Sequence, residues 1–164
     1  MAIPREGPEV DLILWRHAEA LEAVEGGDDL IRPLTARGKK QSVRMAGWLD
    51  RQLPEGARIM VSPALRCQQT VAALRRRYKT RDELGPTSDA SRLLQLAQWP
   101  QGRGVVVLVG HQPALGDAIA AMLGLTQAEL AVKKGAIWWL RSRARDQREG
   151  APAVLLAVQS PETV

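Results

Sequence analysis

Three short runs of apolar residues constrain the fold more than any other feature of this sequence. They are VDLILW (10–15), ARIMVS (57–62) and GVVVLVG (104–110), and each is rich in hydrophobic residues with hardly an interruption. A strand that is apolar at successive positions has both faces covered, which is typical of parallel strands between layers of helices. The runs therefore predict buried strands of a parallel sheet.

Segments with helical spacing separate these runs. In 35–53, residues Val43, Ala46, Leu49 and Leu53 recur at intervals of three and four, and Thr35 precedes them as a predicted helix cap. Further helices are predicted over 63–78, 87–99 (capped by Thr87 or Ser88), 112–124 and 126–132, and strands over 136–142 and 153–159. The alternation predicts an α/β fold, a three-layer α/β/α sandwich with a mostly parallel central sheet, in one domain over 1–164.

Polar side chains follow each of the three runs. The chain has two histidines, His17 and His111, which come directly after the first and third runs, while Ser62 ends the second. The same turns also supply Arg16, Arg66 and Gln112. The carboxyl ends of parallel strands meet at one edge of a sheet, where ligands of α/β proteins bind. Two arginines beside helix N-termini there indicate a pocket for a dianion such as a phosphoryl group.

The net charge of +5 results from 23 lysines and arginines against 18 acidic residues. Much of the basic charge lies in LRRRYKTR (74–81) and LRSRARDQR (140–148). Basic runs attract anions, nucleic acids included, but no nucleic-acid recognition motif accompanies these two. We therefore expect the charge to draw in a small anionic or phosphorylated substrate, and we expect no nucleic-acid partner.

Other classes of protein are disfavoured by what the sequence lacks. No apolar run approaches the roughly 18 residues of a membrane helix, and MAIPREGPEV is unlike a signal peptide, so we expect a cytoplasmic protein. The lone Cys67 is interpreted as a small buried hydrophobe. Two histidines without an acidic cluster match no usual metal-ligand pattern, so neither a metal nor another cofactor is expected. The oligomeric state is not predicted.

Four ordered motifs resemble the histidine phosphatase superfamily, which also contains the phosphoglycerate mutases. Arg16-His17-Ala18 is similar to its RHG signature, and RPLTARG (32–38), SPALRCQQT (62–70) and GHQPALG (110–116) follow in order. The small phosphohistidine phosphatases of the SixA type are the most similar branch. The resemblance runs from residue 10 to about residue 125 and implies a phosphoglycerate mutase-like fold.

The resemblance implies roles for five side chains. His17 would be the nucleophile, forming a covalent phosphohistidine that water then hydrolyses. Arg16 and Arg66 would hold the equatorial phosphoryl oxygens, and His111 would add a hydrogen bond and a proton. Arg32 matches an arginine that would line the same pocket. Neighbouring arginines should lower the pKa of His17 and keep its ring neutral for attack.

Other candidate residues carry two interpretations. Ser62 and Gln112 adjoin the expected pocket as substrate-binding candidates, although Ser62 would serve equally as a helix cap. Ala18 replaces the glycine of RHG, so the backbone there need not adopt a conformation restricted to glycine. Many members supply a mid-chain glutamate as general acid. Glu83 and Asp89 occupy the corresponding region, and either would otherwise be an exposed loop carboxylate.

The leaving group distinguishes the possible substrates. An alcohol needs a proton as its P–O bond breaks, whereas a phosphohistidine protonated on its other ring nitrogen leaves as neutral imidazole. A weak acid site therefore favours a phosphohistidine phosphatase that acts on a histidine-phosphorylated signalling or carrier protein. The alternatives are a small-molecule phosphomonoesterase with the same nucleophile, acting on a phosphorylated metabolite, and a non-catalytic module that binds phosphate or nucleic acid.

Overall fold

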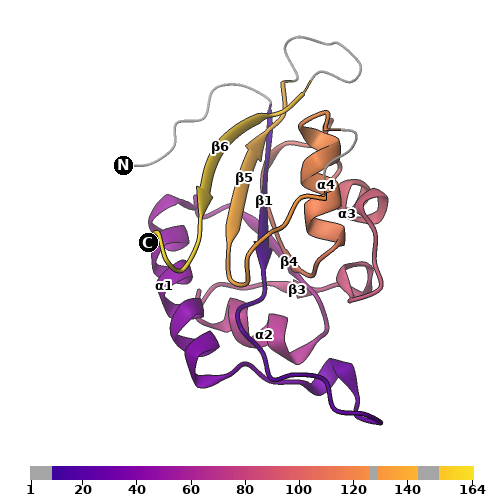
Figure 1. Ribbon diagram of the computed structural model, residues 1–164. Helices are drawn as coiled ribbons and strands as arrows, with labels where there is room; N and C mark the ends of the chain where they lie inside the picture. Colours follow the sequence, from indigo (N-terminus) through magenta and orange to yellow (C-terminus); the bar gives the residue numbers. More distant parts are fainter. Residues whose placement is uncertain (1–8, 126–128, 144–151) are drawn as a thin grey trace.

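The computed structural model describes residues 9–125, 129–143 and 152–164 around a six-stranded sheet with the order β3-β2-β4-β1-β5-β6. The strands are β1 (Val10–Arg16), β2 (Arg58–Val61), β3 (Lys79–Thr80), β4 (Gly104–Gly110), β5 (Ile137–Arg141) and β6 (Val154–Gln159). The first four run parallel to one another, β5 pairs with β1 in the antiparallel direction, and β6 pairs antiparallel with β5 (Figure 1). The predicted mostly parallel sheet is confirmed.

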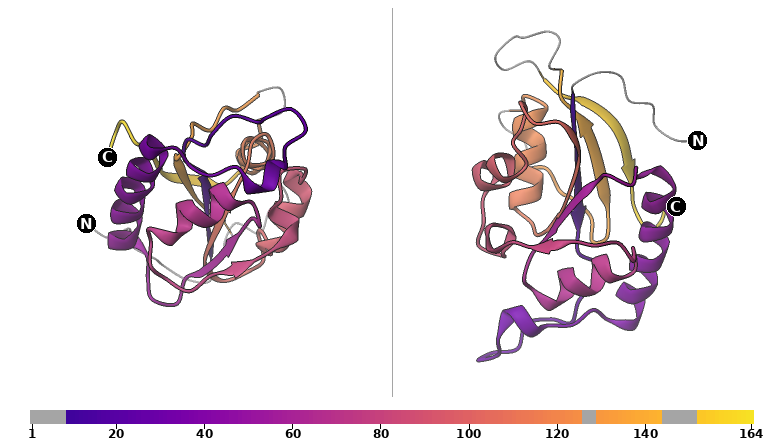
Figure 2. Two further views of the ribbon diagram at one scale, coloured as in Figure 1. Left: turned by 90° about the horizontal axis from the view of Figure 1, so that it is seen from below. Right: turned by 180° about the vertical axis from the view of Figure 1, so that it is seen from behind.

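Helices cover both faces of the sheet (Figure 2). One layer holds α1 (Ala36–Gln52) and α2 (Leu65–Ala72), and the other holds α3 (Ala90–Leu96) and α4 (Ala114–Met122). Two 3-10 turns, η1 (Asp29–Ile31) and η2 (Asp82–Leu84), lie in the connections. None of the helices in the described part of the chain has the length and apolar character needed to cross a membrane.

The alternation of side chains along β1 explains why its sequence is continuously apolar. Leu12 and Leu14 pack with the core beneath α3 and α4, whereas Ile13 and Trp15 pack with the core beneath α1 and α2. All four side chains are fully buried. Because each face of the strand meets a helical layer, neither set of positions tolerates a polar residue without a partner.

Two predicted helices differ from the structure. The helix expected over 63–78 ends at Ala72, because the chain then turns through Arg75, whose φ of 55° is in the left-handed region that a continuing helix does not allow. The residues after this turn form the edge strand β3. A helix over 126–132 was also expected. Residues 126–128 lie outside the described residues, and 129–132 are not helical.

The predicted N-terminal cap of α1 is confirmed, whereas the predicted caps of α3 are wrong. Thr35 caps α1, since its hydroxyl oxygen accepts a hydrogen bond from the Gly38 amide at 2.9 Å. In α3 the cap is neither Thr87 nor Ser88. Asp89 takes this place, accepting from the Arg92 amide at 2.9 Å. The carboxylate satisfies an N-terminal amide that the helix itself leaves without an acceptor.

Candidate active site

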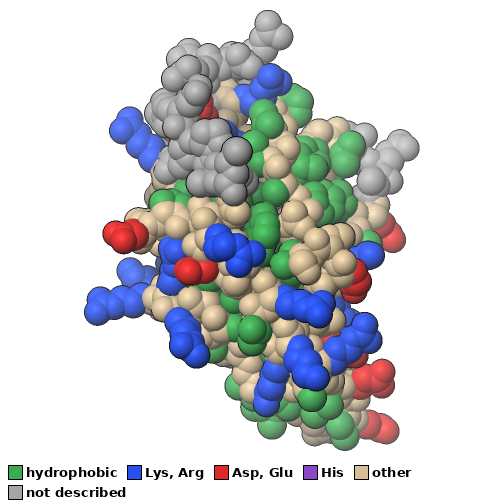
Figure 3. All heavy atoms as spheres, turned by 90° about the vertical axis from the view of Figure 1, so that its left-hand side faces the viewer, with side chains coloured by type: hydrophobic (Ala, Val, Ile, Leu, Met, Phe, Trp, Pro, Cys, Tyr) green, Lys and Arg blue, Asp and Glu red, His purple; other side chains and the backbone are tan. Residues whose placement is uncertain are grey.

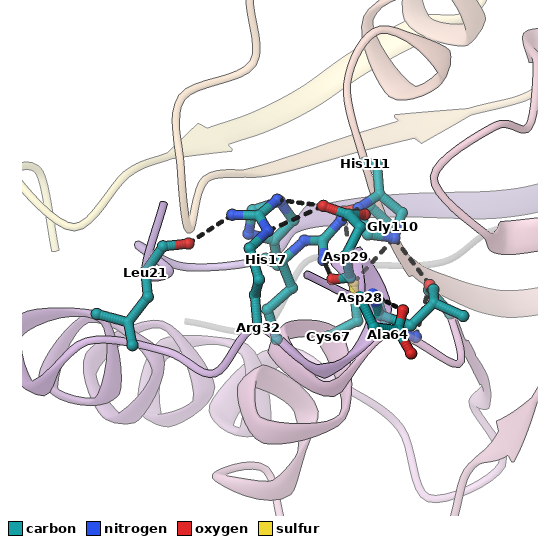
Figure 4. Close-up of polar contacts among 12 residues, drawn as sticks. His17, Leu21, Asp28, Asp29, Arg32, Ala64, Cys67, Gly110 and His111 are labelled. Atoms are coloured by element: carbon teal, nitrogen blue, oxygen red, sulfur yellow. Dashed lines mark hydrogen bonds and ion pairs between the residues drawn. The ribbon is translucent and has the colours of Figure 1, made fainter. Parts of the chain in front are cut away.

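The register of three parallel strands brings the two histidines together. β4 lies between β1 and β2, and it pairs Arg16 with Gly110 and Val61 with Val109. The residues that follow the strands continue this pairing, because the His17 amide donates to Gly110 O at 3.2 Å. His17 and His111 therefore emerge at one level, with their ring centroids 5.3 Å apart (Figure 4).

His17 is held as a neutral ring with one free nitrogen. Its Nδ1 lies 2.8 Å from the carbonyl oxygen of Ala18, which only accepts, so Nδ1 carries the proton and Nε2 has the lone pair. Burial, assisted by the charges of Arg66 and Arg16, lowers the pKa of His17 to about 4. The direction agrees with the sequence-based expectation, but burial rather than the arginines is the largest cause.

His111 is fixed by partners on both ring nitrogens. Nδ1 lies 3.3 Å from Nη2 of Arg66, which only donates, so Nδ1 is the acceptor and Nε2 carries the proton. Nε2 then donates to Ser62 Oγ at 2.8 Å. Burial, together with the nearby His17 and Arg66, lowers the pKa of His111 to about 3.

Two arginines approach the histidines with unused hydrogen-bond donors. Arg66 is 3% exposed, and its Nη1 and Nη2 donate to the backbone oxygen and carboxylate of Asp29 at 2.7 and 3.0 Å. Arg16 donates from Nη1 to Val132 O at 2.8 Å. The Nε atoms of Arg16 and Arg66 are both buried without a partner in the described structure. A buried cationic donor without an acceptor is costly, and an oxyanion would satisfy it.

Asp29 joins two arginines that the sequence assigned to the pocket. Oδ1 of Asp29 accepts from Arg32 Nε at 2.9 Å, and Oδ2 accepts from Arg66 Nη2 at 3.0 Å. Partial burial acts to raise the pKa of Asp29, but the hydrogen bonds from Arg32 and Arg66 outweigh it and lower that pKa. The sequence analysis did not single out Asp29, although its position three residues before Arg32 was an available signal.

The loop that carries Asp29 and Arg32 is closed against the start of α1. Ala20 and Leu34 form an isolated β-bridge, and the Thr35 amide donates to Glu19 O at 3.0 Å. Gly38 allows this close approach, since a Cβ there would lie 2.0 Å from Glu19 O. The glycine and the threonine of RPLTARG thus place Arg32 at the pocket through the local backbone.

These side chains surround a cavity of about 240 Å³. It is lined by Arg16, His17, Ala20, Glu22, Arg32, Arg66, Pro86, His111, Gln112 and Lys134. Four cationic side chains and one carboxylate make the lining strongly positive, so the cavity fits a phosphoryl dianion. Sequence reasoning missed Glu22 and Lys134, because neither belongs to a motif and both are brought in by loops.

The remaining predicted residues have different positions. Ser62 is completely buried behind His111 and does not line the cavity. Gln112 lines it, but its amide is engaged with Leu130 O at 2.9 Å and the Gly116 amide at 2.7 Å. Glu83 and Asp89 are not brought to the cavity. Asp89 caps α3, and a hydrogen bond from Arg81 lowers the pKa of Glu83, opposite to what a general acid needs.

No cluster of three or more histidine, cysteine, aspartate or glutamate side chains suited to a metal ion occurs among the described residues. Cys67 is buried beside His111, with Sγ 3.5 Å from Nε2, and burial raises the pKa of its thiol to about 12. The cysteine is therefore a neutral packing residue under the histidine, as the sequence suggested.

Comparison with known proteins agrees with this geometry. The model of the histidine phosphatase superfamily (branch 1) matches residues 12–86. The phosphohistidine phosphatase SixA of Escherichia coli K12 is 31% identical over 121 residues, which cover 69% of this chain and 74% of that protein. The chain belongs to the histidine phosphatase superfamily, and it is a phosphatase.

Solved structures extend the similarity over nearly the whole chain. A protein assigned as phosphohistidine phosphatase SixA of Agrobacterium tumefaciens is 26% identical with a TM-score of 0.77, covering 95% of this chain and 100% of that one. A mycobacterial glucosyl-3-phosphoglycerate phosphatase is 19% identical with a TM-score of 0.65, covering 88% of this chain and 96% of that one. The second likeness shows only the phosphoglycerate mutase-like fold.

The low pKa values of the two histidines predict a specific NMR titration. Because the chain has two histidines, its imidazole signals are few, and a His111→Gln variant assigns them. We expect the signal of His17 to titrate near pH 4 and that of His111 near pH 3, with neither changing at the ordinary value of about 6.5. Above pH 5 both rings are then neutral. Titration of either signal near pH 6.5 contradicts the burial described here.

Ser62→Ala tests the hydrogen bond that Nε2 of His111 donates to the serine. Without the serine oxygen, the Nε2 proton loses its acceptor, and we expect kcat/KM to fall about tenfold, the effect of one hydrogen bond. Because Arg66 still donates to Nδ1, the tautomer is kept, and the nitrogen-15 chemical shift of Nε2 should change as its hydrogen bond is lost. Ser91→Ala, an exposed serine of α3, is the control. Unchanged shifts and rates in Ser62→Ala would show that the serine only packs.

Proposed function

We propose that this protein is a phosphohistidine phosphatase that removes the phosphoryl group from a histidine-phosphorylated protein. His17 acts as the nucleophile, and the phosphoryl group passes through a covalent phosphohistidine at its Nε2. The observation that carries the proposal is the combination of a buried neutral imidazole and two arginines that line the same cavity. A nucleophile and an oxyanion site are the two parts that phosphoryl transfer requires.

The attack is supported by the state of the His17 ring. Nδ1–H stays bonded to Ala18 O, so the lone pair of Nε2 forms the new P–N bond while the substrate P–N bond breaks. Nδ1 keeps its proton, and the phosphorylated ring stays oriented by the same carbonyl. Water then attacks the phosphorus, the Nε2–P bond breaks, and inorganic phosphate takes up the water protons as the neutral ring is restored.

Stabilisation of the transferred group is supported by the arginines. Arg16 and Arg66 line the cavity and supply fixed cationic donors for the equatorial oxygens, where negative charge spreads as the bonds to phosphorus rearrange. Arg32 adds a third cation to the lining of the cavity. Because the guanidinium groups are held by Val132 O and Asp29, they need little reorganisation when the substrate binds.

The nature of the leaving group supports a P–N rather than a P–O substrate. Glu83 and Asp89 do not line the cavity, and the two histidines are neutral at physiological pH. An alkoxide would leave poorly without a proton, whereas a substrate histidine protonated on its other nitrogen leaves as neutral imidazole. The similarity to SixA phosphohistidine phosphatases favours the same substrate class.

His17→Ala tests the proposal directly. Phosphate release from a histidine-phosphorylated peptide should fall by at least about 10³-fold, because the covalent route is lost. Rapid quenching of the wild type should trap an acid-labile, base-stable phosphoenzyme that the variant does not form. Arg37→Ala, on the exposed side of α1, is the control. Full activity of His17→Ala would refute the nucleophile.

One observation favours a second candidate, a small-molecule phosphomonoesterase. Glu22 is the single carboxylate among the described residues that line the cavity, and it lies on the exposed loop at its mouth. A carboxyl group there is positioned to meet the leaving group of a bound ester. In this case Glu22 would protonate the departing alcohol, and the substrate would be a phosphorylated metabolite rather than a protein.

Glu22→Gln separates the two candidates. A phosphomonoesterase that depends on this acid should lose about 10²- to 10⁴-fold in kcat on p-nitrophenyl phosphate or a sugar phosphate. A phosphohistidine phosphatase should keep its rate on the phosphohistidine peptide within about twofold, because neutral imidazole needs no such proton. Glu25→Gln, on the same exposed loop, is the matched control. A large loss on the phosphohistidine peptide would count against the leading proposal.

A further inference from the structure

The basic run over 74–81 has no part in the active site. Its residues 77–81 lie at the β3 edge of the sheet, where the structure has a hollow of about 670 Å³. Arg58, Arg81 and Arg92 line this hollow, which we call the arginine groove. A neighbouring hollow of about 400 Å³ shares Arg58 and Arg81 with it and adds Arg77 and Lys79. Basic side chains from β2, α3 and the run after α2 thus converge.

The charges of the arginine groove are available to a partner. Arg81 pairs with Glu83, its Nε lying 3.1 Å from Oε2. Arg58 and Arg92 are both exposed and form no ion pair with a carboxylate of the described chain. Met60 and Leu96 contribute apolar surface to the same groove. Exposed guanidinium groups beside apolar surface suit a peptide that carries carboxylates.

The backbone next to the groove favours an extended partner. β3 is the outermost strand, so one of its edges pairs with β2 and the other pairs with no strand of the described residues. Both of its residues, Lys79 and Thr80, are exposed. An extended segment is able to lie along such an edge, with backbone hydrogen bonds to the strand and side chains in the flanking hollows.

One short segment of the chain contributes to both the arginine groove and the active-site cavity. Arg81 and Glu83 line the groove, whereas Pro86, three residues further along the chain, lines the cavity around His17. Between them Leu84 is buried in the core, and its carbonyl oxygen lies near Gly110, the residue before His111. A protein that contacts the segment 81–86 is therefore within reach of both hollows.

We propose that the arginine groove binds an extended acidic segment of the phosphohistidine-bearing protein while its phosphohistidine occupies the active site. This inference rests on the proposed function. A protein segment is favoured over a nucleic acid, because only a polypeptide backbone can hydrogen-bond along the outer edge of β3 beside the groove. The ring of Tyr78 is also tied to Gln68 by its hydroxyl at 2.8 Å, which restrains it as a base-stacking platform.

Two phosphohistidine peptides test the proposal, one with glutamates flanking the phosphohistidine and one with glutamines in their place. For the wild type we expect KM to be about tenfold lower for the glutamate peptide, the effect of two exposed ion pairs. Arg58→Glu/Arg92→Glu should abolish this preference and leave turnover of free phosphohistidine unchanged. The preference should also shrink in about 0.5 M salt, where exposed charges are screened.

The control has to carry the same change in charge elsewhere, because basic side chains are not confined to the groove. Figure 3 shows lysine and arginine side chains spread over the face on the left-hand side of Figure 1, with no histidine visible there. Lys39→Glu/Lys40→Glu changes two exposed residues at the start of α1, neither of which lines the arginine groove or the neighbouring hollow. This variant should keep the preference for the glutamate peptide.

The outcomes distinguish the groove from the catalytic proposal. If the wild type shows the same KM for both peptides, the proposal that the groove binds an acidic segment is wrong. It is also wrong if Arg58→Glu/Arg92→Glu keeps the lower KM for the glutamate peptide. Failure of the wild type to release phosphate from either peptide, with hydrolysis of p-nitrophenyl phosphate intact, refutes the proposed function instead. In that case the groove is tested by the fluorescence anisotropy of an unphosphorylated, labelled glutamate peptide. If the peptide binds the wild type and the groove variant equally well, the groove is not its binding site. Tighter binding of a single-stranded oligonucleotide at the groove also overturns the proposal.

Discussion

The pairing of β4 with both β1 and β2 is the constraint on which the site depends. It places Arg16 opposite Gly110 and Val61 opposite Val109, so three strands end at the same level. A slip of one residue in either pair would move the following side chain to the other face of the sheet. The fully buried, β-branched residues of β4 oppose such a slip, because they fill both cores at once.

The sequence predicted the features that depend on local pattern. Continuous apolar runs identified β1, β2 and β4, and the motifs around His17, Arg66 and His111 identified the pocket. The end of α2 was not predictable, since nothing in the run after it signals the left-handed turn at Arg75. The helix predicted over 126–132 is wrong for the described residues 129–132, because contacts with the rest of the fold determine the backbone conformation there. Val132 is buried and its carbonyl oxygen accepts from Arg16, which holds this backbone against the start of the active-site loop.

The sequence also did not predict what causes the low pKa of His17 or where the candidate carboxylates lie. Neighbouring arginines were expected to keep His17 neutral, yet burial has the larger effect on its pKa. Burial depends on the packing of the whole layer and cannot be read from a motif. The same holds for the carboxylates, because Glu83 and Asp89 satisfy an arginine and a helix end instead of approaching the cavity. The position of the two carboxylates in the sequence did not show whether they would line the cavity or form an ion pair and a helix cap.

The bridge that Asp29 makes between Arg32 and Arg66 bears on the entropy of catalysis. A free arginine side chain has several rotatable bonds, and ordering it on each binding event would weaken the affinity for a small ligand. Here the carboxylate and the backbone oxygen of one residue hold Arg66 in place before any ligand arrives. In the proposed mechanism, the rotamer freedom of Arg66 is lost once, when the chain folds, and not again in every turnover.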